Sequence, residues 1–309
     1  MPRSRSLGCA AAITALLIWS AWFAVTRLSV THELRAADIV ILRVGVGSLV
    51  LLPFFLGEFW RMPKRAWAEA IILSLCWGAP FVLLLALGIQ LTSAAHAAAL
   101  TPSTMPVFAG VLAWIFLGVR PAPRQLAGYA VIVAGVVALT FGAGKGDDTR
   151  HETVGDLALL GAALGWAIYT VRLRGSGLTT IQAAFLVCFY STVGYLPIYL
   201  LGGFARVGDA SWSELALQIV YQGVLVGGLS VVAYNVAIAQ LGPNAAAVVA
   251  SLVPVVAALL AFPILGDVPT SVEAVAIAVI SVGVLLAAAA VRRRDPGVSV
   301  RSSAAGASR

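Results

Sequence analysis

Apolar runs of about 20 residues, separated by short polar loops, fill most of this chain. A helix of about 20 apolar residues spans the ~30 Å hydrocarbon core of a bilayer. The composition agrees, because 61% of the residues are hydrophobic and 11% are charged, against roughly 45–50% and 25% in soluble domains. The segments of about ten residues with alternating polarity that a β-barrel requires are not visible in the sequence. The pattern therefore predicts an all-α integral membrane protein.

Ten transmembrane helices are predicted, with ends uncertain by a few residues. They cover residues 9–27, 39–57, 67–90, 94–118, 123–142, 155–174, 179–202, 214–240, 244–265 and 270–291. A polar loop at 143–154 joins the two halves, and the basic tail at 292–309 is expected to be disordered and cytoplasmic because it lacks the apolar residues of a packed segment.

The two halves are copies of one design. Residues 106–121 (PVFAGVLAWIFLGVRP) and 254–269 (PVVAALLAFPILGDVP) are identical at eight of 16 positions, and the offset of 148 continues from 130–136 to 278–284. The predicted repeats are residues 1–142 and 155–291, with five spans each. Because five is odd, the second copy must enter the membrane from the opposite side, so the repeats are expected to be inverted. Internal repeats of this kind are characteristic of transporters.

The basic residues predict the orientation. With the N-terminus in the cytoplasm, 14 Lys and Arg residues fall in cytoplasmic segments and five in external segments. Cytoplasmic loops carry the excess of Lys and Arg. We therefore expect a multi-pass protein of the cell inner (plasma) membrane with both termini in the cytoplasm.

Several stretches resemble one family. They are GDLALLGAALGWAIYTVRLR at 155–174, LTSAAHAAALTPSTMPVFAGVLAWIFLGVRP at 91–121, WSAWFAVTR at 19–27, and Arg43 near the start of the second span. In this order they resemble EamA-type proteins of the drug/metabolite transporter superfamily. The resemblance implies export of a small metabolite, such as an amino acid, by alternating access. The family often has a Glu after the Gly that closes the fourth span, where this chain has Val119, and its repeat counterpart is Asp267.

Neutral side chains deep in the spans are candidates to line a solute cavity. Aromatic belts usually lie at membrane interfaces, so aromatic residues in mid-span are informative. Ordinary packing, lipid contact or hydrogen bonding between helices are the alternatives. The candidates are Trp19, Trp22, Trp77, Phe81, Thr101, Ser103, Trp166, Tyr169, Tyr234 and Asn235.

Two ionisable residues are candidates for gating or charge attraction. Arg43 lies one turn into the second span and His96 at the start of the fourth. Ionisable groups within spans are costly and often functional. The alternatives are that Arg43 reaches the interface or pairs with Asp38, and that His96 is a hydrogen-bonded interfacial residue. The acidic residues lie in loops or near span ends, so we expect facilitated diffusion or exchange, with any pH effect passing through His96.

Other functions are less consistent with the sequence. A multidrug exporter of cationic compounds is an alternative, but the missing mid-span carboxylate disfavours it. An intramembrane enzyme would need paired carboxylates or His, and a channel would need charge rings or a filter loop; neither pattern is found. The expected partners are a small-molecule solute and the lipid bilayer. No nucleic acid, cofactor or metal is expected, and the oligomeric state stays open, a monomer being possible.

Overall fold

The computed structural model describes residues 5–291 except 58, 63, 143–148, 174 and 242. Every regular element in this part of the chain is a helix, which confirms the predicted all-α class. The first half contains α1 (Arg5–Thr31), α2 (Ala36–Leu56), the short 3-10 helix η1 (Phe59–Arg61), α3 (Lys64–Trp77), α4 (Ala79–Leu91), α5 (Ala94–Leu117) and α6 (Pro123–Gly142). The second contains α7 (Thr149–Leu173), α8 (Thr180–Leu201), α9 (Trp212–Gln218), the π-helix η2 (Ile219–Leu229), α10 (Ser230–Leu241), α11 (Pro243–Leu265) and α12 (Ser271–Val291).

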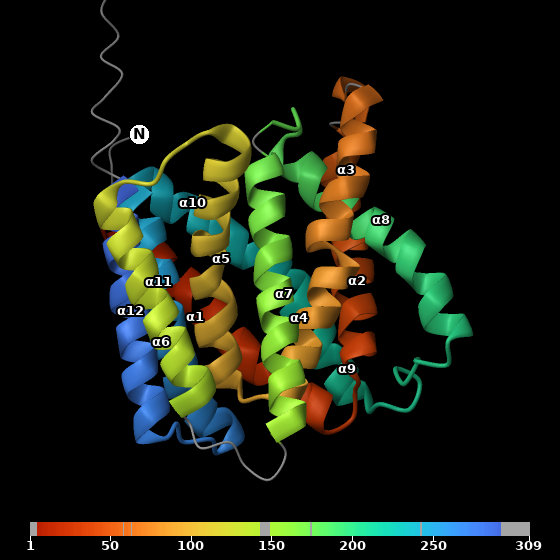
Figure 1. Cartoon of the computed structure of the whole chain (residues 1–309). Coiled ribbons are helices and arrows are strands. Elements are labelled where there is room, and N and C mark those ends of the chain that lie inside the picture. Colours follow the sequence, from red (N-terminus) through yellow and green to blue (C-terminus); the bar gives the residue numbers. More distant parts are fainter. Residues whose placement is uncertain are drawn as a thin grey trace, which may run out of the picture.

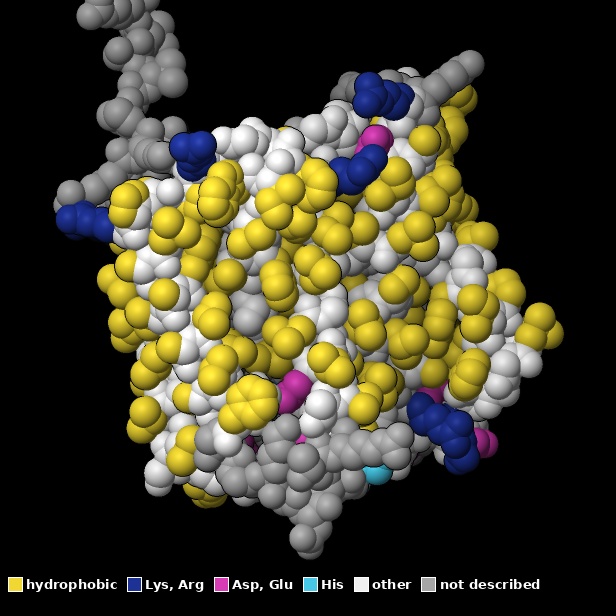
Figure 2. All heavy atoms as spheres, in the orientation of Figure 1, with side chains coloured by type: hydrophobic (Ala, Val, Ile, Leu, Met, Phe, Trp, Pro, Cys, Tyr) yellow, Lys and Arg dark blue, Asp and Glu magenta, His cyan; other side chains and the backbone are white. Residues whose placement is uncertain are grey.

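The helices form a bundle (Figure 1), and many large apolar side chains are exposed on it. Among the described residues, eight helices are long and apolar enough to cross a membrane. Large apolar side chains point outward from them, including Phe116, Phe141 and Leu157. Figure 2 shows hydrophobic side chains over the middle of one face and Lys and Arg side chains toward its two ends. A contiguous apolar belt of this extent is expected where lipid, and not water, surrounds a protein.

The third predicted span, residues 67–90, is interrupted at Gly78. Proline has no N–H and clashes with the preceding helical turn, and Pro80 lies at the start of α4. The N–H of Ala79, which the break leaves without a helical acceptor, donates to Ser191 Oγ of α8 at 3.0 Å. A Cβ at position 78 would lie 1.8 Å from that oxygen. Only glycine therefore fits the break.

The span predicted at 214–240 is also irregular, but in a different way. It consists of α9, the π-helix η2 and α10 in direct succession. A π-helix forms i→i+5 hydrogen bonds, is rare, and occurs frequently at functional sites. Eleven residues of the π form, Ile219–Leu229, therefore mark this segment as a place to look for function.

Helices α6 and α12 lie side by side and pack through glycine (Figure 1). A Cβ at Gly135 would lie 2.6 Å from Ile280 Cγ1, and a Cβ at Gly283 would lie 2.8 Å from Ile132 Cγ1. Gly128 lies in the same way against Ala287. Residue numbers rise along α6 while their partners fall along α12, so the two helices are antiparallel. Small residues allow close helix approach in membranes.

The remaining contacts between the halves follow a matching pattern. Helix α1 packs against α10 and α11, and α7 packs against α4 and α5. Gly8 of α1 abuts Leu241 at the end of α10, while Gly155 of α7 abuts Leu91 at the end of α4. Helices α2 and α8 also pack against each other. The two halves are thus joined through several pairs of helices.

Candidate functional site

An interior cavity lies where α2, α8, η2 and the break between α3 and α4 meet. Its volume is about 120 Å³, equal to roughly four water molecules at about 30 Å³ each. The lining is mostly apolar, with four side chains that can form hydrogen bonds. The lining residues are Arg43, Val44, Gly47, Val50, Leu51, Trp77, Gly78, Val82, Ala184, Val187, Cys188, Gln222, Gly223 and Val226.

Among the described residues of this lining, Arg43 contributes the only charged group. Its guanidinium carbon lies 5.0 Å from the ring centroid of Trp22, within the range of a cation–π contact. Among the described residues, no carboxylate lies within ion-pair distance of Arg43 and no acceptor hydrogen-bonds to it. Asp38, the partner considered in the sequence analysis, instead accepts hydrogen bonds from Tyr199 of α8 and from the backbone N–H of Arg206. Arg43 is therefore an unpaired cation facing the cavity.

A chain of buried hydrogen bonds runs from Trp22 toward the start of α9. Trp22 Nε1 donates to Gln222 Oε1 at 2.9 Å, and Gln222 Nε2 donates to Gln218 Oε1 at 3.1 Å. Gln218 Nε2 donates to Ser29 Oγ at 2.6 Å, and Ser29 donates to the Glu214 carboxylate. Each side chain donates to the next, and the last donor reaches Glu214. Neither glutamine was among the residues predicted from the sequence, although two Gln residues four apart in an apolar run were a visible signal.

The π-helix places Gln222 beside Arg43. Gln222 is 2% exposed and Gln218 is fully buried, so neither amide can turn to solvent. Gly223 allows the backbone of η2 to approach α2, since a Cβ at position 223 would lie 2.3 Å from Val46 Cγ1. Close approach of η2 to α2 brings the Gln222 amide to the wall of the cavity.

A small polar cluster fixes the end of the hydrogen-bond chain that lies at α9. Ser211, the N-cap of α9, accepts the N–H of Glu214 at 3.3 Å and donates through its own hydroxyl to Glu33 Oε1 at 3.1 Å. The N–H of Ser211 donates to Glu33 as well. These two donors hold the pKa of the Glu33 carboxyl below its usual range. The cluster therefore holds Glu214 close to Ser29.

The predicted aromatic residues form two separate groups. In the first, Trp77 stacks on Tyr169 with ring centroids 4.6 Å apart, and Phe81 lies 5.9 Å from Trp77 and 6.1 Å from Trp166. Trp77 lines the cavity, and its indole N–H is buried without an acceptor in the described part of the chain. The other three rings pack behind it and do not line the cavity.

The second aromatic group joins α1 to α10. Trp19 lies 4.9 Å from Tyr234, centroid to centroid, and its Nε1 donates to Ser230 Oγ at 2.9 Å. The repeat-related residues Trp19 and Trp166 thus each contact an aromatic ring on the third span of the other half. Neither lines the cavity in this conformation.

Of the predicted polar residues of the fourth span, Thr101 contacts α7. Thr101 Oγ1 donates to the carbonyl of Leu159 at 3.2 Å. The Ser103 hydroxyl is buried and has no partner among the described residues. The side chain of Asn235 lies outside the described residues. Thr101 and Ser103 do not line the cavity. The hydroxyl of Thr101 links α5 to α7.

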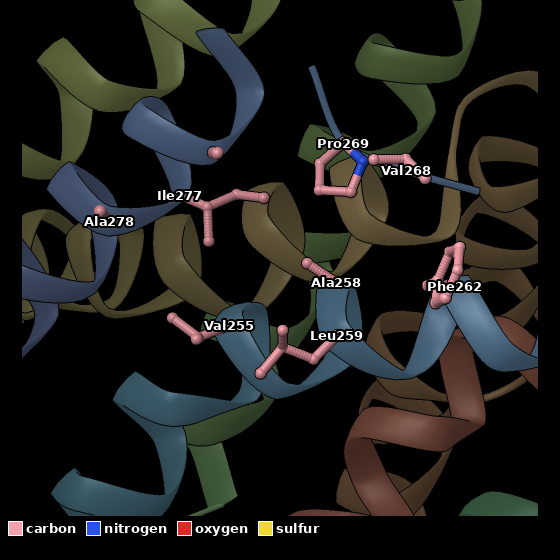
Figure 3. Close-up of a pocket in the computed structure, with 9 residues that line it drawn as sticks. Val255, Ala258, Leu259, Phe262, Val268, Pro269, Ile277 and Ala278 are labelled. Atoms are coloured by element: carbon pink, nitrogen blue, oxygen red, sulfur yellow. The ribbon is translucent and has the colours of Figure 1, made fainter. Parts of the chain in front are cut away.

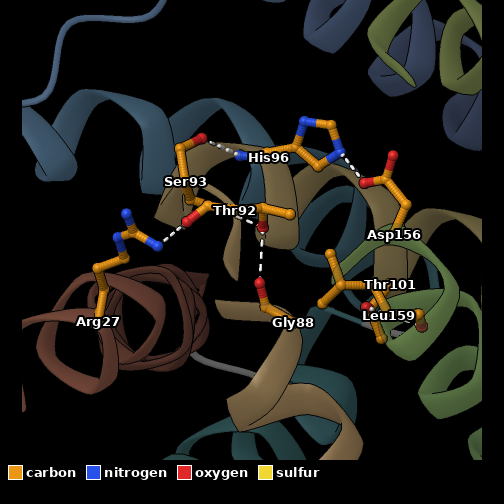
Figure 4. A network of polar contacts seen from close by, with 8 residues as sticks. All are labelled: Arg27, Gly88, Thr92, Ser93, His96, Thr101, Asp156 and Leu159. Atoms are coloured by element: carbon orange, nitrogen blue, oxygen red, sulfur yellow. Dashed lines mark hydrogen bonds and ion pairs between the residues drawn. The ribbon is translucent and has the colours of Figure 1, made fainter. Parts of the chain in front are cut away.

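His96 belongs to a different network, at the junction of α4 and α5 (Figure 4). Its Nε2 lies 2.7 Å from Asp156 Oδ1 of α7, and its backbone N–H donates to Ser93 Oγ. Arg27 of α1 donates to backbone carbonyls at the end of α4, including that of Gln90 at 3.0 Å. The network ties α1, α5 and α7 together and is separate from the cavity that Arg43 lines.

A larger groove lies on the outside of α11 and α12 (Figure 3). Its volume is about 590 Å³. Its lining offers no polar side chain that could orient a solute, as ligand sites normally do. The lining residues are Val255, Ala258, Leu259, Phe262, Val268, Pro269, Ala274, Ile277 and Ala278. The smaller Arg43 cavity is therefore the candidate site.

Replacing Trp19 or Trp166 with alanine should impair transport more than it lowers the amount of folded protein. Each residue contacts an aromatic ring of the other half. Loss of these contacts should alter how the two halves move against each other during transport. The measurement compares solute flux per folded molecule. Trp114→Ala is the matched control, because Trp114 is 48% exposed on α5. Equal loss of abundance and flux would show that Trp19 and Trp166 are packing residues only.

A bundle of membrane-length helices around a small interior cavity with polar groups is the architecture of a multi-pass membrane transporter. The model of the EamA-like transporter family matches residues 6–141 and again residues 153–289. The chain therefore belongs to the EamA-like transporter family, which confirms the resemblance seen in the sequence.

Three relatives and one solved structure are similar to this chain. A probable terminal-alkyne amino-acid exporter of Streptantibioticus cattleyicolor is 30% identical over 62% of this chain and 63% of its own length. The uncharacterized transporter YetK of Bacillus subtilis is 24% identical over 70% and 66%, so this chain spans less than two thirds of either relative. An uncharacterized transporter of Archaeoglobus fulgidus is 27% identical over 89% and 94%. One crystal structure shares the fold, with a TM-score of 0.64, 23% identity, and coverage of 94% of this chain and 100% of the other.

Proposed function

We propose that the protein exports a small metabolite, such as an amino acid, across the membrane by alternating access. The observation that carries this proposal is the unpaired Arg43 in an interior cavity of a chain of the EamA-like transporter family. A fixed positive charge repels cationic solutes and attracts acidic ones, which disfavours the alternative of a cationic-drug exporter. The name of the Streptantibioticus relative, an amino-acid exporter, supports the same choice of solute.

The two halves, residues 1–142 and 155–291, are proposed to be inverted five-helix repeats. Support comes from α6 and α12, which hold equivalent positions in the repeat and pack antiparallel through the same pair of residue types twice, Gly135 on Ile280 and Gly283 on Ile132. Reciprocal contacts of this kind are expected around a two-fold axis. Inverted repeats that exchange their conformations open a central site first to one side and then to the other.

Reporter fusions test the proposed orientation in the inner membrane. Fusions at Lys64 and Arg292 should report the cytoplasm and a fusion at Asp147 the outside, because 14 basic residues lie on the cytoplasmic side of this arrangement and five on the other. The measurement is paired activity of a phosphatase and a fluorescent reporter at each site. Asp147 and Arg292 on the same side would contradict the model of five plus five spans.

An efflux screen tests the function itself. Cells that overproduce the protein should resist toxic amino-acid analogues and release more amino acids into the medium than cells with an empty vector. Resistance to lipophilic cations should not rise, because Arg43 would have to accommodate a second positive charge. Raised resistance to cations without any change for amino-acid analogues would favour the multidrug alternative.

Energy coupling is proposed to come from the solute gradient. Among the described residues, no acidic side chain lines the cavity, and His96 with Asp156 forms an ionisable pair in a separate network. Flux in proteoliposomes should persist without an imposed pH gradient, and any pH effect should disappear in His96→Ala. Strong uphill transport driven by protons and retained in His96→Ala would instead point to an acidic group near a helix end, Asp38 or Asp156 first.

A further inference from the structure

We propose that Arg43 binds the carboxylate of the solute, and that the transported class is small apolar carboxylates, amino acids included. The inference rests on the proposed function and names the chemical group that the site recognises. Arg43 is the charged residue of the cavity lining, and no acidic side chain of the described chain neutralises it. A guanidinium presents up to five N–H donors in a planar fork that matches a carboxylate.

The other polar groups of the lining are donors as well. The oxygen of the Gln222 amide accepts a hydrogen bond from Trp22, and its nitrogen uses one hydrogen for Gln218. A second N–H of that amide stays available, since a primary amide has two donors. The Trp77 indole N–H is buried without an acceptor among the described residues. A cavity in which three side chains supply donors, one of them a cation, and in which no described side chain is acidic is complementary to an anion.

The hydrogen-bond chain keeps this arrangement in place. It holds the Trp22 ring under the guanidinium, and it ends on the carboxylate of Glu214. Its aligned donors place the balancing negative charge at the α9 end, at a distance from Arg43 that leaves the guanidinium unpaired. Trp22 and Gln218 are therefore positioning residues, whereas Arg43, Gln222 and Trp77 supply the donors that face the solute.

The rest of the lining sets the size and polarity of the solute. Valine side chains at 44, 50, 82, 187 and 226 surround the polar groups, and about 120 Å³ is enough for a carboxylate with a short aliphatic chain. Since Arg43 repels cations and no carboxylate is found among the described lining residues, an ammonium group contributes little to recognition. Leucine and 4-methylpentanoate should therefore both bind, whereas leucinamide and 3-methylbutylamine should not.

Cys188 provides a reporter, because it lines the same cavity. In a background with Cys9→Ser and Cys76→Ser, its rate of modification is measured with an anionic methanethiosulfonate that carries a sulfonate and with a cationic one that carries a trimethylammonium group. The ratio of the two rates cancels the thiolate fraction of Cys188. Division by the same ratio for a small free thiol cancels the difference in intrinsic reactivity between the two reagents. We expect a preference for the anion of about tenfold or more from one nearby charge at low effective dielectric, and a normalised ratio near one in Arg43→Gln.

Arg172→Gln is the matched control, since Arg172 is 45% exposed in an ion pair with Glu69 at the end of α7. It should leave the ratio unchanged. Arg43→Lys covers the case in which Arg43→Gln does not fold. Lysine retains the charge but not the fork, so the preference for the anion should remain while protection by solute weakens.

The solute arm of the experiment uses the same reporter. Leucine and 4-methylpentanoate should slow the modification of Cys188, the amide and the amine should not, and the protection should be lost in Arg43→Gln. Equal protection by leucinamide, or an unchanged ratio of reagents in Arg43→Gln, would overturn the inference. Amino-acid efflux that survives Arg43→Gln would reject the inference alone. Arg43-dependent labelling without any efflux would reject the proposed function while the carboxylate site stands.

Discussion

Replacing Gly135 with leucine is expected to remove most of the folded protein from the membrane. The new Cβ would lie 2.6 Å from Ile280 Cγ1 and 3.1 Å from the backbone nitrogen of Ile280. The side chain of Ile280 could turn aside, but the backbone of α12 cannot do so without separating the two helices. Overpacking typically costs about 1–3 kcal/mol, and more where the backbone must shift. We expect the upper end of that range or beyond it, measured as monodisperse protein and as thermal stability in detergent.

Gly283→Leu should have an effect of similar size, because Gly283 forms the matching contact with Ile132. Gly194→Leu in α8 is the control, since a Cβ at that position meets nothing within 4 Å. A normal yield of Gly135→Leu would mean that α6 and α12 are not packed as described. A similar loss of folded protein in Gly194→Leu would mean that replacing glycine with leucine is harmful at any helix position.

Gln222→Leu is expected to destabilise the protein by about 2 kcal/mol or more, and to abolish solute-dependent protection of Cys188. The change leaves the Trp22 N–H and the Gln218 carbonyl buried without partners. Each unsatisfied group costs about 1–3 kcal/mol. This cost exceeds the ~0.6 kcal/mol average net value of a hydrogen bond between membrane helices. It is larger because the Trp22 N–H and the Gln218 side-chain oxygen remain in place, buried and without access to water. Thermal unfolding in detergent measures the change.

A double variant separates the hydrogen bond from packing. Trp22→Phe combined with Gln222→Leu removes donor and acceptor together, so the two losses should be less than additive. Gln125→Leu is the matched control for glutamine, since Gln125 is half-buried at the start of α6 and its amide bonds only the Tyr129 hydroxyl. Strict additivity of the double variant would show that Trp22 and Gln222 are not coupled.

Membrane spans were the most predictable part of the fold. The bilayer fixes the length of an apolar helix, so the spans predicted at 94–118 and 123–142 agree with α5 and α6 within one residue. The interruption at Gly78 was not predicted. Pro80 and Gly78 were visible, but the N–H that the break releases is satisfied by Ser191, more than 100 residues away. Local sequence cannot show that such an acceptor is in reach.

The candidate site was predicted in part. Arg43 and Trp77 were proposed from the cost of a charge and the rarity of an indole at depth, and both line the cavity. Whether Arg43 pairs with Asp38 could not be decided from their spacing. Tyr199 and the backbone of Arg206, both in the second half, occupy Asp38 instead. Gln222 was missed because its position depends on the π-helix, which hydropathy does not reveal.

The third span of each half, predicted at 67–90 and at 214–240, is irregular, and this affects the resting state of the proposed carrier. One half bends at the single residue Gly78, while the other spreads its irregularity over the 11 residues of η2. If the halves exchange conformations during transport, these two segments must exchange shapes, and they differ in backbone hydrogen bonding. Outward-open and inward-open forms then differ in free energy even when solute concentrations are equal. The empty carrier would accordingly spend most of its time open to one side.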